Sequence, residues 1–263
     1  MSEPSNVVVE TVGPIDWIRL NRPEMRNAIA RDSAERVTEA LRASERRGAR
    51  VVVLTGSGGS FCSGADLKAE GVDLGDPSSI RSILVEAYHP LLLTMTRIPI
   101  PVVAAVDGIA AGIGCDLALA ADLRLASARA AFSQIFVQVG LIPDGGGTFT
   151  LPRLVGMTRA MEMALTGRKV PADEALAWGM INHVFPTETF GDEVRAYVED
   201  LATRAPLSMA RSKQAIREAC EAVTFERSLQ REAELQGDLF ASRDFVEGVT
   251  AFVEKRKPTF EGC

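Results

Sequence analysis

Residues 51–67, VVVLTGSGGSFCSGADL, join a short run of mostly β-branched residues to a loop rich in glycine and serine. The run Val51–Thr55 is apolar at nearly every position, which is typical of a strand covered on both faces. The loop Gly56–Gly64 follows it. A second segment of the same kind begins with the apolar run Val102–Val106 and continues into the glycine-containing stretch Gly108–Leu117. Strand, loop and helix therefore alternate, and this pattern predicts an α/β fold.

The same unit recurs at uneven intervals over the first two thirds of the chain. Further strands are predicted at Val7–Val12 and Ile15–Leu20, which flank Gly13-Pro14 as a hairpin, and at Leu123–Ala126 and Ala131–Ser133. Helical spacing predicts helices at Asn27–Arg47, Ser79–Arg97, Gly112–Ala121 and Met157–Leu165.

From Glu188 onward the pattern changes to helices without a strand signal between them. These helices are predicted at Glu188–Arg204, Leu207–Cys220, Phe225–Ala241 and Asp244–Lys255. We expect two parts, a core at residues 1–204 and a helical C-terminal region at residues 205–263, joined at Arg204-Ala205-Pro206. A tail of this kind is expected to serve packing or oligomerisation.

Charge and composition exclude several classes of protein. The 263 residues include 29 Lys and Arg against 35 Asp and Glu, a net charge of −6, whereas general nucleic-acid binding needs the opposite balance. The four cysteines lie far apart without a CxxC pair, and only two histidines occur. We therefore expect no disulfide framework, no metal site and no nucleic-acid partner, and a reducing cytoplasm as the location.

No membrane or secretory segment is expected either. The most apolar stretch, from Ile98 to Ala121, contains two prolines and two aspartates. Each central Asp would cost about 2.5–3.5 kcal/mol in a bilayer. The first six residues lack the basic and apolar regions of a secretory signal.

Common catalytic motifs are missing from the sequence. It contains no Walker A sequence, no HExxH and no GxSxG, and Gly112-Ile113-Gly114 lacks the third glycine of a dinucleotide fingerprint. What remains are two glycine loops, each leading into a helix whose first N–H groups have no intrahelical partner. Two such helix starts that converge stabilise an oxyanion such as an enolate. Spacing alone favours the simpler interpretation of two tight turns.

A third glycine loop, Gly140–Thr148, places one carboxylate, Asp144, among apolar residues and glycines. A carboxylate in such surroundings has a raised pKa and is suited to act as a base. An aspartate in a turn, or one that caps the next helix, fits the Pro-Asp-Gly chemistry equally well. The residues of this loop leave both interpretations open.

Several long motifs, in the same order, are similar to those of the crotonase superfamily, the enoyl-CoA hydratases and isomerases. They are Asn21-Arg22-Pro23, Arg26-Asn27-Ala28, Phe61–Leu67, Asp107–Leu119, Leu141-Ile142-Pro143, Gly145–Thr148 and Gly248–Lys257. The resemblance covers essentially the whole chain. It implies a spiral core of ββα units, a helical C-terminal trimerisation region and often a dimer of trimers. It also implies acyl-CoA substrates and no cofactor, because coenzyme A is part of the substrate.

The resemblance also implies roles for individual residues. The oxyanion hole corresponds to the N–H groups of Ala65 and Ile113, where many relatives have glycine in place of Ile113. The residues expected to contact the substrate are Arg26, Ala28, Ser63, Ala65, Asp66, Leu67, Gly112 and Phe136. Lys255 matches a basic residue that reaches the nucleotide from a neighbouring subunit. Arg26 and Lys255 also fit the simpler interpretation of solvated surface charges.

Two positions depart from the hydratases of this superfamily, which typically carry two catalytic glutamates. The first glutamate position is Asp116, which is one methylene shorter, and a misplacement of about 1 Å costs on the order of 100-fold in rate. Asp116 is equally interpreted as a structural residue of its helix. The second position is Phe136, which neither holds nor activates a water.

Asp144 matches a different branch. Its Gly-Leu-Ile-Pro-Asp loop and the following Leu151-Pro152-Arg153 are similar to the bacterial 1,2-epoxyphenylacetyl-CoA isomerases. The resemblance implies an acyl-CoA isomerase with Asp144 as its single acid/base and with Phe136 lining a dry pocket, which the segment Ser79–Arg97 covers. Two alternatives stay open: a hydratase that uses Asp116 with Asp144, and a non-catalytic acyl-CoA-binding trimer.

Overall fold

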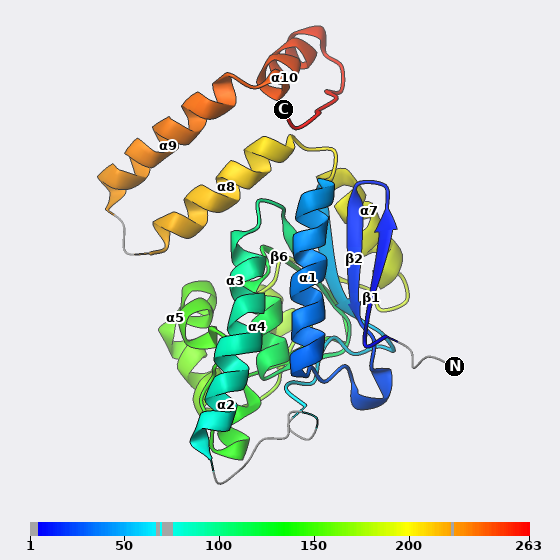
Figure 1. The fold of residues 1–263 in the computed structure, drawn as a ribbon, viewed down its shortest axis with the longest axis vertical. Coiled ribbons are helices and arrows are strands. Elements are labelled where there is room, and N and C mark those ends of the chain that lie inside the picture. The colour runs from blue at the N-terminus through cyan, green and yellow to red at the C-terminus, as the bar shows by residue number, and fades with distance from the viewer. Residues whose placement is uncertain (1–4, 67–68, 70–75, 222–223) are drawn as a thin grey trace.

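The computed structural model describes residues 5–66, 69, 76–221 and 224–263, and its centre is a six-stranded sheet (Figure 1). In spatial order the strands are β1 (Val7–Val12), β2 (Ile15–Leu20), β3 (Val51–Gly56), β4 (Val102–Val106), β6 (Leu123–Ser127) and β9 (His183–Phe185). The pair β1 and β2 is antiparallel, and every other pair in this sheet is parallel. A second sheet contains β5 (Ile109–Ala111), β7 (Ala131–Ser133) and β8 (Val170–Pro171).

Helices cover the main sheet and form the C-terminal region. Around the sheets lie α1 (Arg31–Arg47), α2 (Pro77–Ile83), α3 (His89–Arg97), α4 (Ile113–Ala120), α5 (Gly147–Thr166), α6 (Ala172–Ala177) and α7 (Phe190–Leu201). The C-terminal helices are α8 (Pro206–Ala219), α9 (Phe225–Phe240) and α10 (Arg243–Glu254). Shorter turns are η1 (Pro23–Met25), η2 (Leu84–Tyr88) and η3 (Ile135–Val139).

The apolar strand β3 is buried on both faces, as its sequence predicts. Val52 and Leu54 pack in the larger core cluster, together with side chains of α1 and α3. Val51 and Val53 point to the other face and pack in a second cluster with side chains of α7. Successive side chains of a strand point to opposite faces, so helices on both sides bury the strand completely.

The helix predicted from Asn27 begins only at Arg31, because Asn27 makes a different structure. Its φ of 56° lies in the left-handed region, which Asn tolerates better than most residues. Its buried side-chain amide donates to the carbonyl oxygens of Ser57 and Ser60 at 2.8 and 2.7 Å. Asn27 thus fastens the turn that precedes α1 to the loop that follows β3.

Other elements also differ from their predictions. The predicted helix Ser79–Arg97 is divided by η2, a π turn, in which the N–H of His89 donates to the carbonyl oxygen of Leu84. Pro90 follows directly and has no N–H of its own, which disturbs the normal helical hydrogen bonding at this point. The predicted helix Met157–Leu165 is the second part of α5, which breaks at Gly156. The short elements β5, β8, β9 and α6 were not predicted.

The C-terminal helices α8, α9 and α10 extend away from the sheets (Figure 1). Lys213 of α8 fastens this region to the core, since its Nζ lies 2.8 Å from Asp122 Oδ2 and donates to the carbonyl oxygens of Met95 and Ile100. The division at residues 204 and 205 remains a prediction. Within the described ranges, no helix combines the length and apolar character needed to cross a bilayer.

Candidate active site

The first candidate oxyanion donor, the N–H of Ala65, is turned away from its neighbouring strand segment. Ile29 forms a parallel bridge with Ala65 in which the Ile29 N–H donates to Gly64 and the Asp66 N–H donates to Ile29. Because successive N–H groups of extended chain point to opposite sides, the Ala65 N–H points away from Ile29. It donates no hydrogen bond to another described residue.

The second candidate donor, the N–H of Ile113, is the first of helix α4. It lies at the positive end of the helix dipole and has no intrahelical acceptor. Glycines bring the two loops into contact: Cys62 forms a bridge with Ala110, and a Cβ added at Gly112 would lie 3.9 Å from Gly64 Cα. The structure therefore places the loops that carry Ala65 and Ile113 side by side.

Asp116, which the resemblance predicts to stand at the first hydratase glutamate position, is buried beneath the third glycine loop. Its side chain is 1% exposed, Oδ2 accepts from the Gly145 N–H at 3.0 Å, and Oδ1 accepts from Gln134 Nε2 at 2.7 Å. Burial raises the pKa of Asp116 to about 7 and the charge of Asp144 adds to the rise, while the two hydrogen bonds act against it. Both carboxylate oxygens are thus occupied by donors of the protein.

Asp144 directly precedes Gly145, the glycine whose N–H donates to Asp116, and Asp144 itself is only partly exposed. Burial raises the pKa of the Asp144 carboxyl to about 6, although its own backbone N–H and the nearby His89 act in the opposite direction. His89 Nε2 lies 3.3 Å from the Asp144 carbonyl oxygen. Gly145 packs so closely on α4 that an added Cβ would touch Ile113 Cδ1. Asp144 therefore lies beside the helix start that carries the second donor.

Phe136, which the resemblance predicts to stand at the second hydratase glutamate position, lies in η3 against the same helix start. Its side chain is 7% exposed, and its Cζ would lie 3.7 Å from a Cβ added at Gly112. An aromatic ring at this place contributes apolar surface and no proton-transfer group. Asp144, Phe136, Gly112 and Ile113 therefore form one group of neighbours.

The residues expected to contact the substrate's carrier group form a second group around the Ala65 loop. Ser63 donates from its N–H to the carbonyl oxygen of Arg26 and from its Oγ to that of Met25. Arg26 is exposed with a φ of 50°, and Ala28 is buried next to it. Asp66 is held inside the protein by Arg22, whose Nη1 lies 2.8 Å from its Oδ2.

Two predicted site residues are not part of these groups. Leu67 lies outside the described residues. Lys255 is exposed at the C-terminal end of α10, which Figure 1 places at the opposite end of the molecule from α2. Within one chain Lys255 is therefore remote from the loops that carry Ala65 and Asp144.

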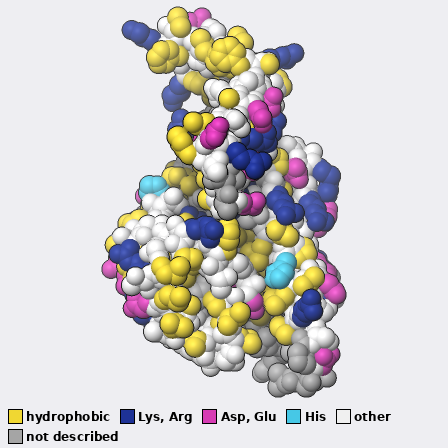
Figure 2. Space-filling model, turned by 90° about the vertical axis from the view of Figure 1, so that its left-hand side faces the viewer, with side chains coloured by type: hydrophobic (Ala, Val, Ile, Leu, Met, Phe, Trp, Pro, Cys, Tyr) yellow, Lys and Arg dark blue, Asp and Glu magenta, His cyan; other side chains and the backbone are white. Residues whose placement is uncertain are grey.

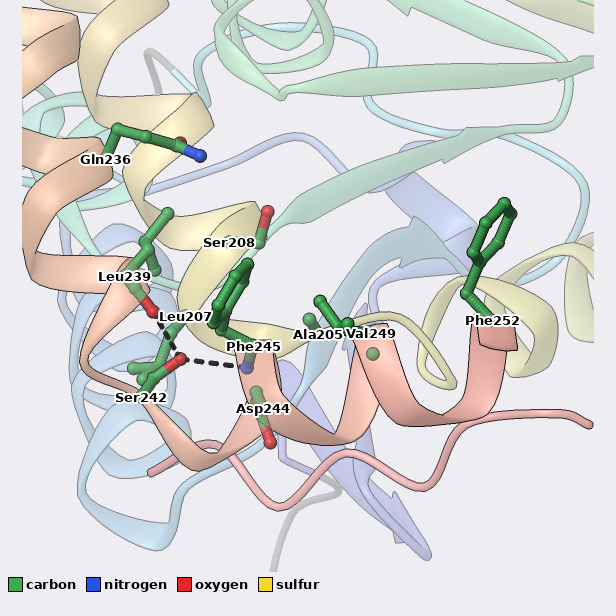
Figure 3. A pocket seen from close by; sticks show the side chains of 11 residues that line it. Ala205, Leu207, Ser208, Gln236, Leu239, Ser242, Asp244, Phe245, Val249 and Phe252 are labelled. Atoms are coloured by element: carbon green, nitrogen blue, oxygen red, sulfur yellow. Dashed lines mark hydrogen bonds between the residues drawn. The ribbon is translucent and has the colours of Figure 1, made fainter. Parts of the chain in front are cut away.

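A cavity of about 350 Å³ lies between α8, α9 and α10 (Figure 3), and Asp144 is not among the residues that line it. It is lined mostly by apolar side chains, among them Leu207, Leu239, Phe245 and Val249. Its one carboxylate, Asp244, accepts hydrogen bonds from the backbone N–H groups of the C-terminal tail. Nothing in this lining is arranged for proton transfer. In the described part of the chain, no group of His, Cys, Asp and Glu side chains is arranged to hold a metal ion.

Sequence reasoning missed two residues that contact this site. His89 lies in the middle of a predicted helix, and the signal that marks its position is the Pro90 that follows it. Gln134 is fully buried, and its Oε1 has no hydrogen-bond partner among the described residues. No local pattern in the sequence distinguishes Gln134 from an ordinary polar residue at the end of a strand.

Comparison with known proteins places this geometry in a family. A family model described as Enoyl-CoA hydratase/isomerase matches residues 10–263. The chain is 46% identical over 248 residues to a "Probable enoyl-CoA hydratase" of Rhodobacter capsulatus, covering 93% of both chains. It is 40% identical over 247 residues to the 1,2-epoxyphenylacetyl-CoA isomerase of Escherichia coli, covering 93% of this chain and 94% of that protein.

Solved structures agree with this placement. The crystal structure of an enoyl-CoA hydratase from Bacillus anthracis matches with a TM-score of 0.93 and 32% identity, covering 98% of this chain and all of that one. This similarity confirms the predicted α/β spiral fold with its helical C-terminal region. The chain therefore belongs to the enoyl-CoA hydratase/isomerase family of the crotonase superfamily, a family of acyl-CoA enzymes.

Proposed function

We propose that the chain is an acyl-CoA isomerase in which Asp144 is the single acid/base. The observation that carries this proposal is the position of a partly buried carboxylate, with a pKa of about 6, beside the α4 helix start. At neutral pH such a group is mostly ionised and still accepts a proton readily, which suits a general base. The free N–H groups of Ala65 and Ile113 supply the matching electrostatic stabilisation.

The proposed reaction is a proton shift through an enolate. The Asp144 carboxylate takes a proton from C2 of a 3-enoyl-CoA, and the electron pair of that C–H bond moves to the thioester oxygen. Ala65 and Ile113 donate hydrogen bonds to this oxyanion, each worth roughly 3–4 kcal/mol in comparable sites. The protonated Asp144 then returns the proton to C4, which leaves the double bond between C2 and C3. No cofactor takes part, because coenzyme A is carried by the substrate.

The surroundings of Asp116 and Phe136 weigh against the two-carboxylate hydratase alternative. Both oxygens of Asp116 accept hydrogen bonds from the protein, so that activation of a water would first break one of them. Phe136 supplies no carboxylate at the second glutamate position, so Asp144 would have to take that role, and the Phe136 ring adds apolar surface beside Gly112. The relative from Rhodobacter capsulatus is nevertheless named a hydratase, so the test must detect added water.

Two isomerisations share this chemistry, a double-bond shift and the rearrangement named in the Escherichia coli relative, which acts on a ring-derived acyl group. An enolate oxygen is common to both. We propose the double-bond shift as the first reaction to test, because it needs nothing beyond the single base and the two donors.

The test is incubation of the protein with a 3-enoyl-CoA and, separately, a 2-enoyl-CoA in heavy water, followed by mass spectrometry of the products. We expect an isomeric enoyl-CoA that has gained no water, with deuterium at C4 only to the extent that the proton on Asp144 exchanges with solvent before it is returned. Asp144→Asn is expected to lower kcat about 10²–10⁴-fold. Asp173→Asn, which changes an exposed aspartate of α6, is the matched control and is expected to keep full activity.

The possible outcomes of this test distinguish the isomerase from the two alternatives. Full turnover of the Asp144→Asn variant contradicts the assignment of the base. A product heavier by one water supports the hydratase alternative with Asp116 and Asp144. Binding of both esters without any turnover supports the non-catalytic trimer.

We also propose that the chain forms a homotrimer or a dimer of trimers through its C-terminal helices. Figure 2 shows hydrophobic side chains gathered over these helices at the top of the molecule. Phe240, Val246, Phe252 and Val253 are each more than half exposed, and a patch of this kind marks an interaction surface. A neighbouring subunit is also what would bring Lys255 to a substrate.

Light scattering of the wild type and of Phe252→Glu tests the assembly. A wild-type trimer or hexamer that dissociates in the variant supports the proposal, and a monomeric wild type contradicts it.

We keep the cytoplasm as the proposed location, because all four cysteines, which lie in the described ranges, are free thiols.

A further inference from the structure

The peptide group that joins Asp144 to Gly145 is held at both ends by side chains from two different helices. Its carbonyl oxygen lies 3.3 Å from His89 Nε2, at the start of α3. Its N–H donates to Asp116 Oδ2 of α4 at 3.0 Å. A carbonyl oxygen only accepts, so this contact places the proton of the imidazole on Nε2.

The two contacts act from opposite sides. In a trans peptide the C=O and N–H bonds point in opposite directions within one plane. Holding both ends therefore fixes the rotation of that plane, which sets ψ of Asp144 and φ of Gly145. The direction in which the Asp144 side chain leaves the backbone depends on this rotation. The three residues that follow Asp144, Gly145–Gly147, have no side chains that could fix it.

Asp116 is itself held firmly in place. Gln134 Nε2 donates to its second oxygen at 2.7 Å, and the carboxylate is 1% exposed. The glycines of the loop leave room for it, since a Cβ added at Gly145 would lie 2.7 Å from Asp116 Cβ, and one added at Gly147 would lie 3.2 Å from Asp116 Cγ. The loop backbone thus rests directly on this carboxylate.

His89 owes its position to the irregular helix around it. The π turn η2 ends at Tyr88, directly before His89, and Pro90 follows, so the helical hydrogen bonding is disturbed around His89. Single π turns within α-helices occur frequently at functional sites. His89 is half-buried, and its ring reaches the loop after η3, which is 55 residues away in the chain.

We propose that His89 and Asp116 are positioning residues that clamp the Asp144–Gly145 peptide group and so aim the Asp144 carboxylate. This proposal rests on the proposed role of Asp144 as the base. It assigns Asp116, which stands where hydratases carry a glutamate, to the support of a neighbouring residue. It assigns a function to His89, which the resemblance to the family did not single out.

The test compares variants that remove a hydrogen bond with variants that keep it. His89→Leu and Asp116→Ala remove one end of the clamp each, and we expect kcat for a 3-enoyl-CoA to fall about 10–100-fold, as for a misplaced catalytic group. His89→Gln keeps an N–H donor, and Asp116→Asn keeps a carbonyl acceptor. These two variants are expected to keep kcat within a few-fold of the wild type.

Two readouts separate positioning from a general structural effect. The dissociation constant of a saturated acyl-CoA of the same chain length and the Tm of His89→Leu are expected to stay close to the wild type, while kcat falls. In the double variant that combines His89→Leu with Asp116→Ala, kcat is expected to be only slightly lower than in the slower of the two single variants, because release of either end already frees the peptide group. Independent effects would instead multiply.

His183→Leu, which changes the exposed histidine of β9, is the matched control and should leave kcat unchanged. Wild-type kcat in both His89→Leu and Asp116→Ala overturns the clamp, and so does a loss that appears equally in binding and Tm. These outcomes differ from failure of the proposed function, which is shown by full turnover of Asp144→Asn, by a product heavier by one water, or by binding of both esters without turnover.

Discussion

Replacement of Gly145 by alanine tests the close contact between the Asp144 loop and helix α4. An added Cβ would lie 2.7 Å from Asp116 Cβ and 2.7 Å from Asp116 Oδ2, and it would also touch Ile113 Cδ1. The Ile113 methyl group is the end of a flexible side chain and moves aside at little cost. Asp116 Cβ belongs to a buried helix and does not, so the loop itself must move.

The size of the effect follows from these distances. An ordinary contact requires the loop to retreat by about 1 Å, since carbon atoms pack at about 3.5–4.0 Å. The same movement lengthens the bond from Gly145 N–H to Asp116 from 3.0 Å to about 4 Å, beyond hydrogen-bond distance. We expect the free energy of unfolding to fall by about 1–3 kcal/mol, typical of an overpacked core. A displacement of the base by about 1 Å predicts a loss of about 100-fold in kcat.

The assay is urea unfolding together with steady-state kinetics on a 3-enoyl-CoA. Gly191→Ala is the control, because an added Cβ in α7 meets nothing within 4 Å and the backbone there has an ordinary φ. That variant is expected to keep wild-type kcat and to gain up to about 1 kcal/mol in stability. Wild-type kcat and stability in Gly145→Ala would refute the argument that Asp116 and the loop hold one another in place.

Three further results are expected. The value of kcat/KM for a 3-enoyl-CoA should fall as the pH drops through about 6, because protonation of Asp144 removes the base, and a profile flat from pH 5 to 8 contradicts this. Asp116→Asn should make the free energy of unfolding less dependent on pH. In the wild type, the folded state keeps the Asp116 proton up to about pH 7, whereas the unfolded state releases it near the ordinary pKa of 3.8. The wild type therefore loses stability as the pH rises between these two values, by at most about 4 kcal/mol, and the variant does not. Equal slopes of unfolding free energy against pH in both proteins would show that Asp116 is not buried as described. Lys213→Met should lower the free energy of unfolding by about 1–3 kcal/mol in urea titrations, because two buried carbonyl oxygens lose their donor while Asp122 keeps Arg217 as its cation, and an unchanged midpoint would contradict this.

The main sheet could be predicted because its strands bury both faces. A strand such as Val51–Gly56 shows a continuous apolar run, and its burial on both sides follows directly from that run. The short strands β5, β8 and β9 have two or three residues each, too few to show a period. They exist because the larger elements bring them together, and only the folded chain contains that information.

The site could be predicted in part, and for a definable reason. The glycine loops are local features and could be selected from the sequence itself, whereas the choice of Ala65, Ile113 and Asp144 within them comes from the resemblance to the family, and their roles stay predictions. The contacts of His89 and Gln134 depend on segments 55 and 18 residues away. The start of α1 was misplaced for a similar reason, since the distant Ser57 and Ser60 hold Asn27 in its left-handed conformation.

The contacts of Asp116 support the proposal that a carboxylate stands at a hydratase position without taking part in hydration. A group that orients a water needs a free oxygen facing the substrate, whereas both oxygens of Asp116 face Gln134 and the Gly145 N–H. Phe136 removes the partner carboxylate and adds apolar surface beside Gly112. In the proposed mechanism, proton transfer therefore falls to Asp144, and burial raises the pKa of its carboxyl to about 6, close to neutrality. A single base of this kind moves a proton between two carbons, and that is the step an isomerase requires.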